Sequence, residues 1–124
     1  MRLNNEERVE VLIKRYDFDF SEKYHVEIRQ LLEKEIINYQ NGSSEYLRFL
    51  CGYLFCIGEV KDIEIINKAK YGINMDVGCM VDAEWIESLK NGGVESEYVR
   101  NRHLLIDDFV SYYSNFEASE DFDE

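Results

Sequence analysis

The stretch 46–58, YLRFLCGYLFCIG, decides the fold of this chain. Apart from Arg48 and two glycines, every residue in it is apolar or aromatic. A helix that is apolar on almost all sides has to be surrounded by other elements. The longest apolar run, residues 49–58, is about half of the roughly 20 residues that a membrane span requires. We therefore expect this stretch to be the central helix of a globular domain.

Helical periodicity continues on both sides of the central stretch. Strand-like alternation is not sustained anywhere, and the absence of proline permits uninterrupted helices. We expect six helices, over residues 5–16, 21–39, 46–57, 60–71, 83–91 and 95–115, and a packed loop over 72–82. The sequence thus predicts an all-α fold of about six helices packed as helical hairpins, either an irregular bundle or stacked helix hairpins.

Capping residues mark several of the predicted boundaries. Asn4 and Asp82 each precede a helical pattern and can accept hydrogen bonds from its first free N–H groups. Gly42, Gly58 and Gly92 follow helical patterns, where a left-handed backbone conformation favours glycine.

The length of 124 residues fits one self-contained domain. We expect a single all-α domain over residues 1–116 and an acidic, frayed tail over 117–124. The cysteines at 51, 56 and 79 are odd in number, and two of them lie in the apolar stretch. This usage indicates reduced thiols. Because the N-terminal residues MRLNNEERVE also lack the apolar segment of a secretion signal, we predict a cytoplasmic protein without membrane association.

The net charge of −12 is unevenly distributed along the chain. Lysine and arginine number 7 against 9 acids in residues 1–42, and 5 against 8 in residues 43–92. Residues 93–124 carry nine acids against only Arg100 and Arg102. Such a field repels nucleic acid and attracts a basic partner. A role of this charge in solubility alone remains an equal alternative.

No pattern in the sequence is typical of a cofactor or metal site. The phosphate-binding glycine loops and the EF-hand spacing are missing, and Cys51 and Cys56 are five residues apart, which does not suit a shared metal ion. His103 lies one helical turn before Asp107, the minimum for an oriented general base, but no nucleophile accompanies the pair. We therefore expect no catalytic residues, no cofactor and no metal.

Acids and tyrosines occur together in the C-terminal third of the chain. An acidic surface with tyrosine anchors is typical of a face that binds a basic protein. Two aspartates at the predicted 72–82 loop extend this set, although the second also fits a helix N-cap. The predicted partner-binding residues are Glu95, Glu97, Tyr98, Asp107, Asp108, Tyr112, Asp76 and Asp82. A water-facing role for the acids and a core role for the tyrosines remain open.

The middle of the chain also has a specific order of motifs. Leu54-Phe55 and Gly58 are followed by Asp62, Ile65-Ile66 and Ala69-Lys70, and then by the two aspartates Asp76 and Asp82. This pattern, over about residues 46–93, resembles small all-helical, HEAT-like bacterial immunity proteins of polymorphic toxin and contact-dependent growth inhibition systems. The resemblance implies that Lys70, Asp76 and Asp82 occupy loop or ion-pair positions.

The resemblance implies an immunity protein that binds and neutralises a cognate bacterial toxin. Combined with the charge, it predicts a basic nuclease toxin domain as partner, blocked by an acidic surface. The sequence leaves the oligomeric state open and favours a monomer. The alternative is a HEAT-like adaptor that binds another protein through an apolar groove including Trp85 or Tyr113. A small enzyme that uses His103 with Asp107 is a third hypothesis.

Overall fold

The structure is a computed structural model that describes residues 2–119, and within this range it is all-α, as predicted. Short 3-10 turns at Glu22–Tyr24 (η1) and Val60–Asp62 (η2) precede two of the helices. The helices are α1 (Asn5–Tyr16), α2 (His25–Ile37), α3 (Glu45–Ile57), α4 (Ile63–Gly72), α5 (Met75–Met80), α6 (Ala83–Asn91) and α7 (Arg102–Ser114). None of the helices in residues 2–119 is long and apolar enough to cross a membrane.

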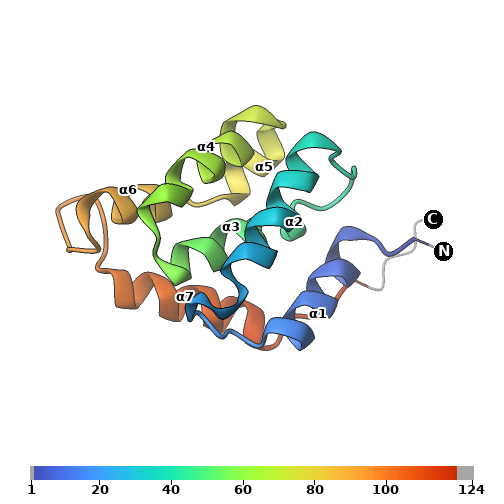
Figure 1. The fold of residues 1–124 in the computed structure, drawn as a ribbon, viewed down its shortest axis with the longest axis horizontal. Helices are drawn as coiled ribbons and strands as arrows, with labels where there is room; N and C mark the ends of the chain where they lie inside the picture. The colour runs from blue at the N-terminus through green and yellow to red at the C-terminus, as the bar shows by residue number, and fades with distance from the viewer. Residues whose placement is uncertain (1, 120–124) are drawn as a thin grey trace.

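Helix α3 lies in the middle of the molecule, as its composition predicts. In Figure 1, α4 and α5 lie above it, α7 runs along the lower edge, and α1 and α2 lie beside it. Every residue from Glu45 to Cys56 is buried except Arg48. The hydrophobic effect therefore favours the packing of the other helices around α3.

Aromatic rings pack α7 against α3. Phe49 of α3 meets Tyr113 of α7 edge to face at 5.0 Å between ring centroids, and Phe109 meets Trp85 of α6 at 6.0 Å. Offset and edge-to-face pairs of this kind add to the energy of burial. Trp85 and Tyr113 are buried, so the prediction that they line an exposed apolar groove is wrong.

Several predicted boundaries are confirmed. Asn4 and Glu7 form a capping box on α1, in which the Asn4 side chain accepts from Glu7 N at 2.8 Å and the Glu7 side chain accepts from Asn4 N at 2.9 Å. Asp82 caps α6. Gly58 and Gly92 end α3 and α6 in the left-handed conformation.

Helix α2 is shorter than predicted at both ends. Ser21 caps the 3-10 turn that precedes it, and the helix ends at Ile37. Gly42 therefore does not end α2; it lies in the loop before α3. A buried Asn5 from α1 fixes this loop by donating to the carbonyls of Gln40 and Ser43, and such a distant partner is invisible in the local pattern.

The prediction of a loop over 72–82 is wrong, because the segment contains α5. Asn74 caps the start of this helix by accepting from Val77 N at 2.9 Å. At its other end, the ammonium group of Lys70 donates to the carbonyls of Gly78 and Val81. A six-residue helix is too short to show a helical period in the sequence. The carbonyl groups at its C-terminal end are capped by Lys70, which belongs to α4.

The predicted helix over 95–115 begins seven residues too early. Residues 93–101 form a loop whose ends are joined by a hydrogen bond from Arg102 N to Gly93 O at 3.1 Å. Helix α7 begins where the side chain of Asn101 caps its first turn. Helical spacing of apolar residues in the loop is thus coincidental.

Candidate functional site

Six of the predicted partner-binding residues are exposed on two consecutive segments, the loop before α7 and α7 itself. Glu95, Glu97 and Tyr98 are exposed in the loop between α6 and α7, and Asp107, Asp108 and Tyr112 are exposed on the outer side of α7. Figure 1 shows this loop at one end of the molecule and α7 running from it along the lower edge. We name these six residues, with Val94 and Leu104, the C-terminal acidic face.

Arg100 fixes the geometry of this face. Its guanidinium donates to Glu84 of α6, with Nη2 to Oε1 at 2.8 Å, and to Asp108 of α7. Its backbone N–H also donates to Glu84 at 3.0 Å. The hydrogen bonds from Arg100 hold the pKa of the Glu84 carboxyl below its usual range. Asp108 therefore helps to position the loop, and it shares its one counter-charge, Arg100, with Glu84.

Three carboxylates of the face remain available to a partner. Glu95, Glu97 and Asp107 are exposed and form no ion pair within residues 2–119. Exposed apolar groups lie among them: Tyr98 is 82% exposed and Val94 64%. Surfaces that combine aromatic or aliphatic anchors with unmatched charge are suited to binding a protein of opposite charge.

The Tyr112 side chain is held by contacts with α3. Its hydroxyl donates to one oxygen of Glu45, and Tyr113 donates to the other at 2.7 Å. The guanidinium of Arg48 lies 3.9 Å from the centroid of the Tyr112 ring. Burial, with a further contribution from the Glu45 carboxylate, raises the pKa of Tyr112 to about 12. One side of the ring remains exposed at the edge of the C-terminal acidic face.

Asp76 and Asp82 do not belong to this surface. Asp82 accepts from Glu84 N at 2.8 Å as the N-cap of α6. Asp76 is exposed in the first turn of α5, and in Figure 1 α3 lies between α5 and α7. The structure thus separates Asp76 from the six residues above.

Glu6 and Glu10 of α1 contact the segment that follows α7. The sequence pattern did not predict these contacts. After α7 the chain returns along α1, where Ala118 N donates to Glu10 at 3.0 Å and Ser119 N donates to Glu6 at 2.6 Å. The Glu6 carboxylate also contributes to the raised pKa of Tyr112. More than 100 residues separate these partners in the sequence, so no local signal brings them together.

The predicted tail over 117–124 is described only in part. Residues 117–119 follow α1 as stated, and Glu117 is exposed. The four tail acids Glu120, Asp121, Asp123 and Glu124 lie outside the described residues.

The two histidines have different surroundings. His103 is exposed on α7, and no hydrogen bond joins it to Asp107, the residue with which it was expected to form an oriented general base. His25 is buried, and its Nε2 lies 2.7 Å from an oxygen of the fully buried Asp62. Arg29 donates to the other oxygen of Asp62. This triad joins the start of α2 to the start of α4 and satisfies the buried carboxylate.

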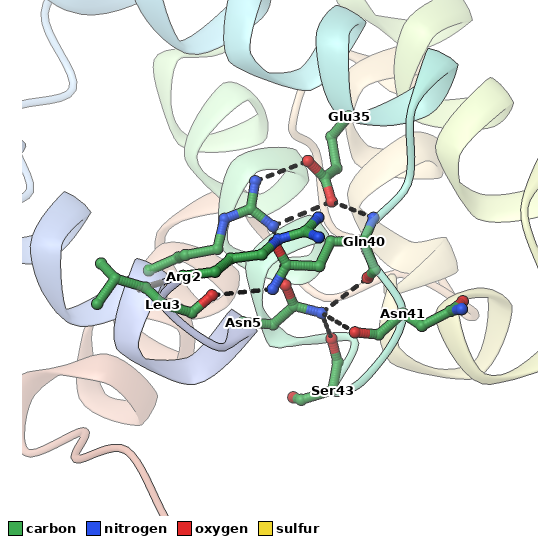
Figure 2. Close-up of polar contacts among 8 residues, drawn as sticks. Arg2, Leu3, Asn5, Glu35, Gln40, Asn41 and Ser43 are labelled. Atoms are coloured by element: carbon green, nitrogen blue, oxygen red, sulfur yellow. Dashed lines mark hydrogen bonds and ion pairs between the residues drawn. The ribbon is translucent and has the colours of Figure 1, made fainter.

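A second polar cluster joins α1, α2 and the loop before α3 (Figure 2). Glu35, nearly buried on α2, accepts two hydrogen bonds from Arg8, at 2.7 and 3.1 Å, and a third from Gln40 N at 2.9 Å. Asn5 accepts from Arg8 and donates to the Ser43 carbonyl at 2.7 Å. Each buried polar group in the cluster thus has a partner.

Cys51 and Cys56 are buried in α3, and burial raises the pKa of both thiols. They therefore behave as small apolar side chains rather than as reactive groups. Within residues 2–119, no group of three or more His, Cys, Asp and Glu side chains is placed to hold a metal ion.

The resemblance over residues 46–93 stays a prediction. No protein family matches the sequence, and neither does any curated protein or solved structure.

Proposed function

We propose that the protein is an immunity protein that binds a cognate bacterial toxin domain of basic charge and covers its active cleft. The observation that supports this most directly is the C-terminal acidic face. There, the carboxylates of Glu95, Glu97 and Asp107 are unmatched and lie next to exposed Tyr98 and Leu104.

The carboxylates and the apolar side chains of this face contribute to different steps of binding. Unmatched carboxylates accelerate encounter with a cationic surface, and the gain falls as salt screens them. Exposed aromatic and aliphatic side chains supply desolvated contacts, which slow dissociation. Because Arg100 and the hydrogen bond from Arg102 N to Gly93 O hold the loop, little conformational entropy is lost on binding.

A nuclease is the toxin class that this surface fits best. A nuclease cleft binds the phosphates of its substrate with basic residues, and a row of carboxylates presents similar charge. Inhibition then requires only that the cleft be occupied, and no bond has to be made or broken. An interface of about 800 Å² on this side would suffice for a stable complex.

The test first asks whether a large secreted protein with a variable C-terminal domain is encoded beside this chain, and then uses that domain, purified with the inhibitor. Calorimetry at 50 and 300 mM salt is expected to give weaker binding at the higher salt. Glu97→Lys with Asp107→Lys should weaken binding at least about tenfold at the lower salt. The matched control is Glu64→Lys, an exposed acid on α4, which should change it less than about threefold. Equal effects of the two variants, or affinity independent of salt, would contradict the proposal.

A second candidate function, a protein-binding adaptor, rests on the outer side of α4. An open hollow of about 800 Å³ there is lined by Val60, Ile63 and Tyr71, and the Tyr71 side chain is 72% exposed. An apolar partner at this hollow would bind with little dependence on salt. Loss of binding in Tyr71→Ala, with none in the acidic-face variants, would favour this function.

A further inference from the structure

One surface of this acidic protein is locally basic. A hollow of about 410 Å³ between the start of α1 and the end of α2 is lined by Arg2, Arg8, Lys34 and Gln40, and Glu35 is the single acid in its lining. Three cations therefore surround one carboxylate, on a chain whose net charge is −12.

The single carboxylate is already matched. Both oxygens of Glu35 accept hydrogen bonds from Arg8, at 2.7 and 3.1 Å, and one of them also accepts from Gln40 N. Arg2 and Lys34 form no ion pair among residues 2–119. Two positive charges at the hollow thus remain without a counter-charge.

The guanidinium of Arg2 is held in place, as Figure 2 shows. Its Nε donates to Gln40 Oε1 at 2.8 Å, and Gln40 Nε2 donates to the Leu3 carbonyl at 2.9 Å. This chain of hydrogen bonds orients Arg2 through Nε alone. Its two terminal nitrogens keep their donors, and such a pair matches two oxygens of a phosphate or a carboxylate.

A neighbouring hollow supplies neutral polar groups. It has a volume of about 540 Å³ and shares Arg2, Asn38 and Gln40 with the first, and Asn41 lines its far side. Amide groups next to a fixed guanidinium can hydrogen-bond the uncharged part of a ligand without adding negative charge.

We propose that this hollow binds a phosphate dianion, free or as a monoester. The terminal nitrogens of Arg2 hold two of its oxygens, and the ammonium group of Lys34 holds a third. Two unmatched positive charges complement a dianion better than a monoanion. Salt screens the attraction between the dianion and the two cations Arg2 and Lys34, so binding is expected to weaken as salt is added. This site is independent of the C-terminal acidic face.

The test is an NMR titration of the ¹⁵N-labelled protein with inorganic phosphate at pH 7.5, with chloride adjusted to keep the ionic strength constant. Saturable shifts are expected for the amides of residues 34–41 and of Leu3. Arg2→Gln with Lys34→Gln should weaken binding about tenfold or more. The control Lys14→Gln, an exposed lysine of α1 away from the hollow, should leave it unchanged. Parallel titrations use phenyl phosphate and acetate.

Each result of these titrations either supports or overturns the proposed phosphate site. The site is supported if phosphate and phenyl phosphate both saturate it and acetate binds clearly more weakly. Tighter binding of phenyl phosphate than of phosphate would identify a monoester as the better ligand. Shifts that are linear and spread over the chain, or equal in the double variant, would overturn it. Equal binding of acetate would overturn the assignment to a dianion. All three substituted side chains are exposed, and the dispersion of each variant's own spectrum reports its folding.

Discussion

Gly52 of α3 lies against the ring of Phe109 of α7, with no space for a side chain between them. A Cβ atom at position 52 would lie 2.3 Å from Phe109 Cε1 and 2.9 Å from Trp85 Cη2. The backbone of α3 therefore approaches α7 as closely as glycine permits. Since α7 bears half of the C-terminal acidic face, the position of that face depends on Gly52.

We expect Gly52→Ala to destabilise the protein by about 2 kcal/mol. Alanine gains about 1 kcal/mol in helix propensity, but overpacking a rigid aromatic core costs more than this. The measurement is urea unfolding followed by circular dichroism. Gly72→Ala is the control, because no side chain and no backbone from another element lies within 4 Å of its Cβ position. A Gly52→Ala variant as stable as Gly72→Ala would mean that α7 does not pack on α3 in this way.

The fold class could be predicted because its signals are local. The apolar stretch that becomes α3, the capping box at Asn4 and the N-cap at Asp82 all act within a few residues. The start of α7 could not be predicted, because the loop before it is held by a hydrogen bond from Arg100 to Glu84, and these residues are 16 positions apart. Helix α5 was missed for a similar reason, since its C-terminal carbonyls are capped by Lys70 of α4.

The acidic face could be predicted only in part. Exposure of Glu95, Glu97 and Asp107 follows from their charge alone. The sequence does not show that Asp108 forms an ion pair with Arg100. It also gives no sign that Glu6 of α1 lies beside the end of α7, because that contact depends on how the helices pack.

Stability should fall at alkaline pH through the two tyrosines that share Glu45. In the unfolded chain tyrosine ionises near pH 10, whereas burial raises the pKa of Tyr112 to about 12 and that of Tyr113 well above its usual value. The unfolded state then loses protons first, so the contribution is complete below pH 10 and is lost as the pH rises from 10 to 12 and beyond.

Urea unfolding between pH 8 and 11.5 measures this effect. The double variant Tyr112→Phe, Tyr113→Phe should show a shallower loss of stability above pH 10 than the unmodified protein. The exposed tyrosines Tyr71 and Tyr98, changed to Phe together, are the control and should leave the slope unchanged. An identical slope in both double variants would contradict the assignment.

Removing Arg8 should be costly because it leaves the buried Glu35 carboxylate without its ion-pair partner. The Glu35 side chain is 7% exposed, and the Arg8 guanidinium also lies 3.6 Å from the centroid of the Tyr46 ring. We expect Arg8→Met to lower the free energy of unfolding by about 3 kcal/mol. Chemical denaturation measures it.

Two further variants separate charge from packing. Arg8→Met combined with Glu35→Leu should recover much of the loss, because no buried charge is then left unmatched. Arg15→Met breaks the more exposed pair with Glu27 and should cost less than about 1 kcal/mol. If the double variant were less stable than Arg8→Met alone, the cluster would act through packing and hydrogen bonds rather than through charge.

Tyr98 should be the main anchor of the partner on the acidic face. Its side chain is 82% exposed, while its neighbour Val99 is buried and Ser96 N donates to the Val99 carbonyl at 2.8 Å, so the ring projects from a fixed turn. An aromatic group presented this way loses little entropy on binding. We expect Tyr98→Ala to weaken toxin binding about 30-fold or more with unchanged stability. Tyr71→Ala is the matched control, an equally prominent tyrosine on α4, and should have no effect. A larger loss in Tyr71→Ala would move the interface to α4, and unchanged affinity in both would leave the acids as the only determinants.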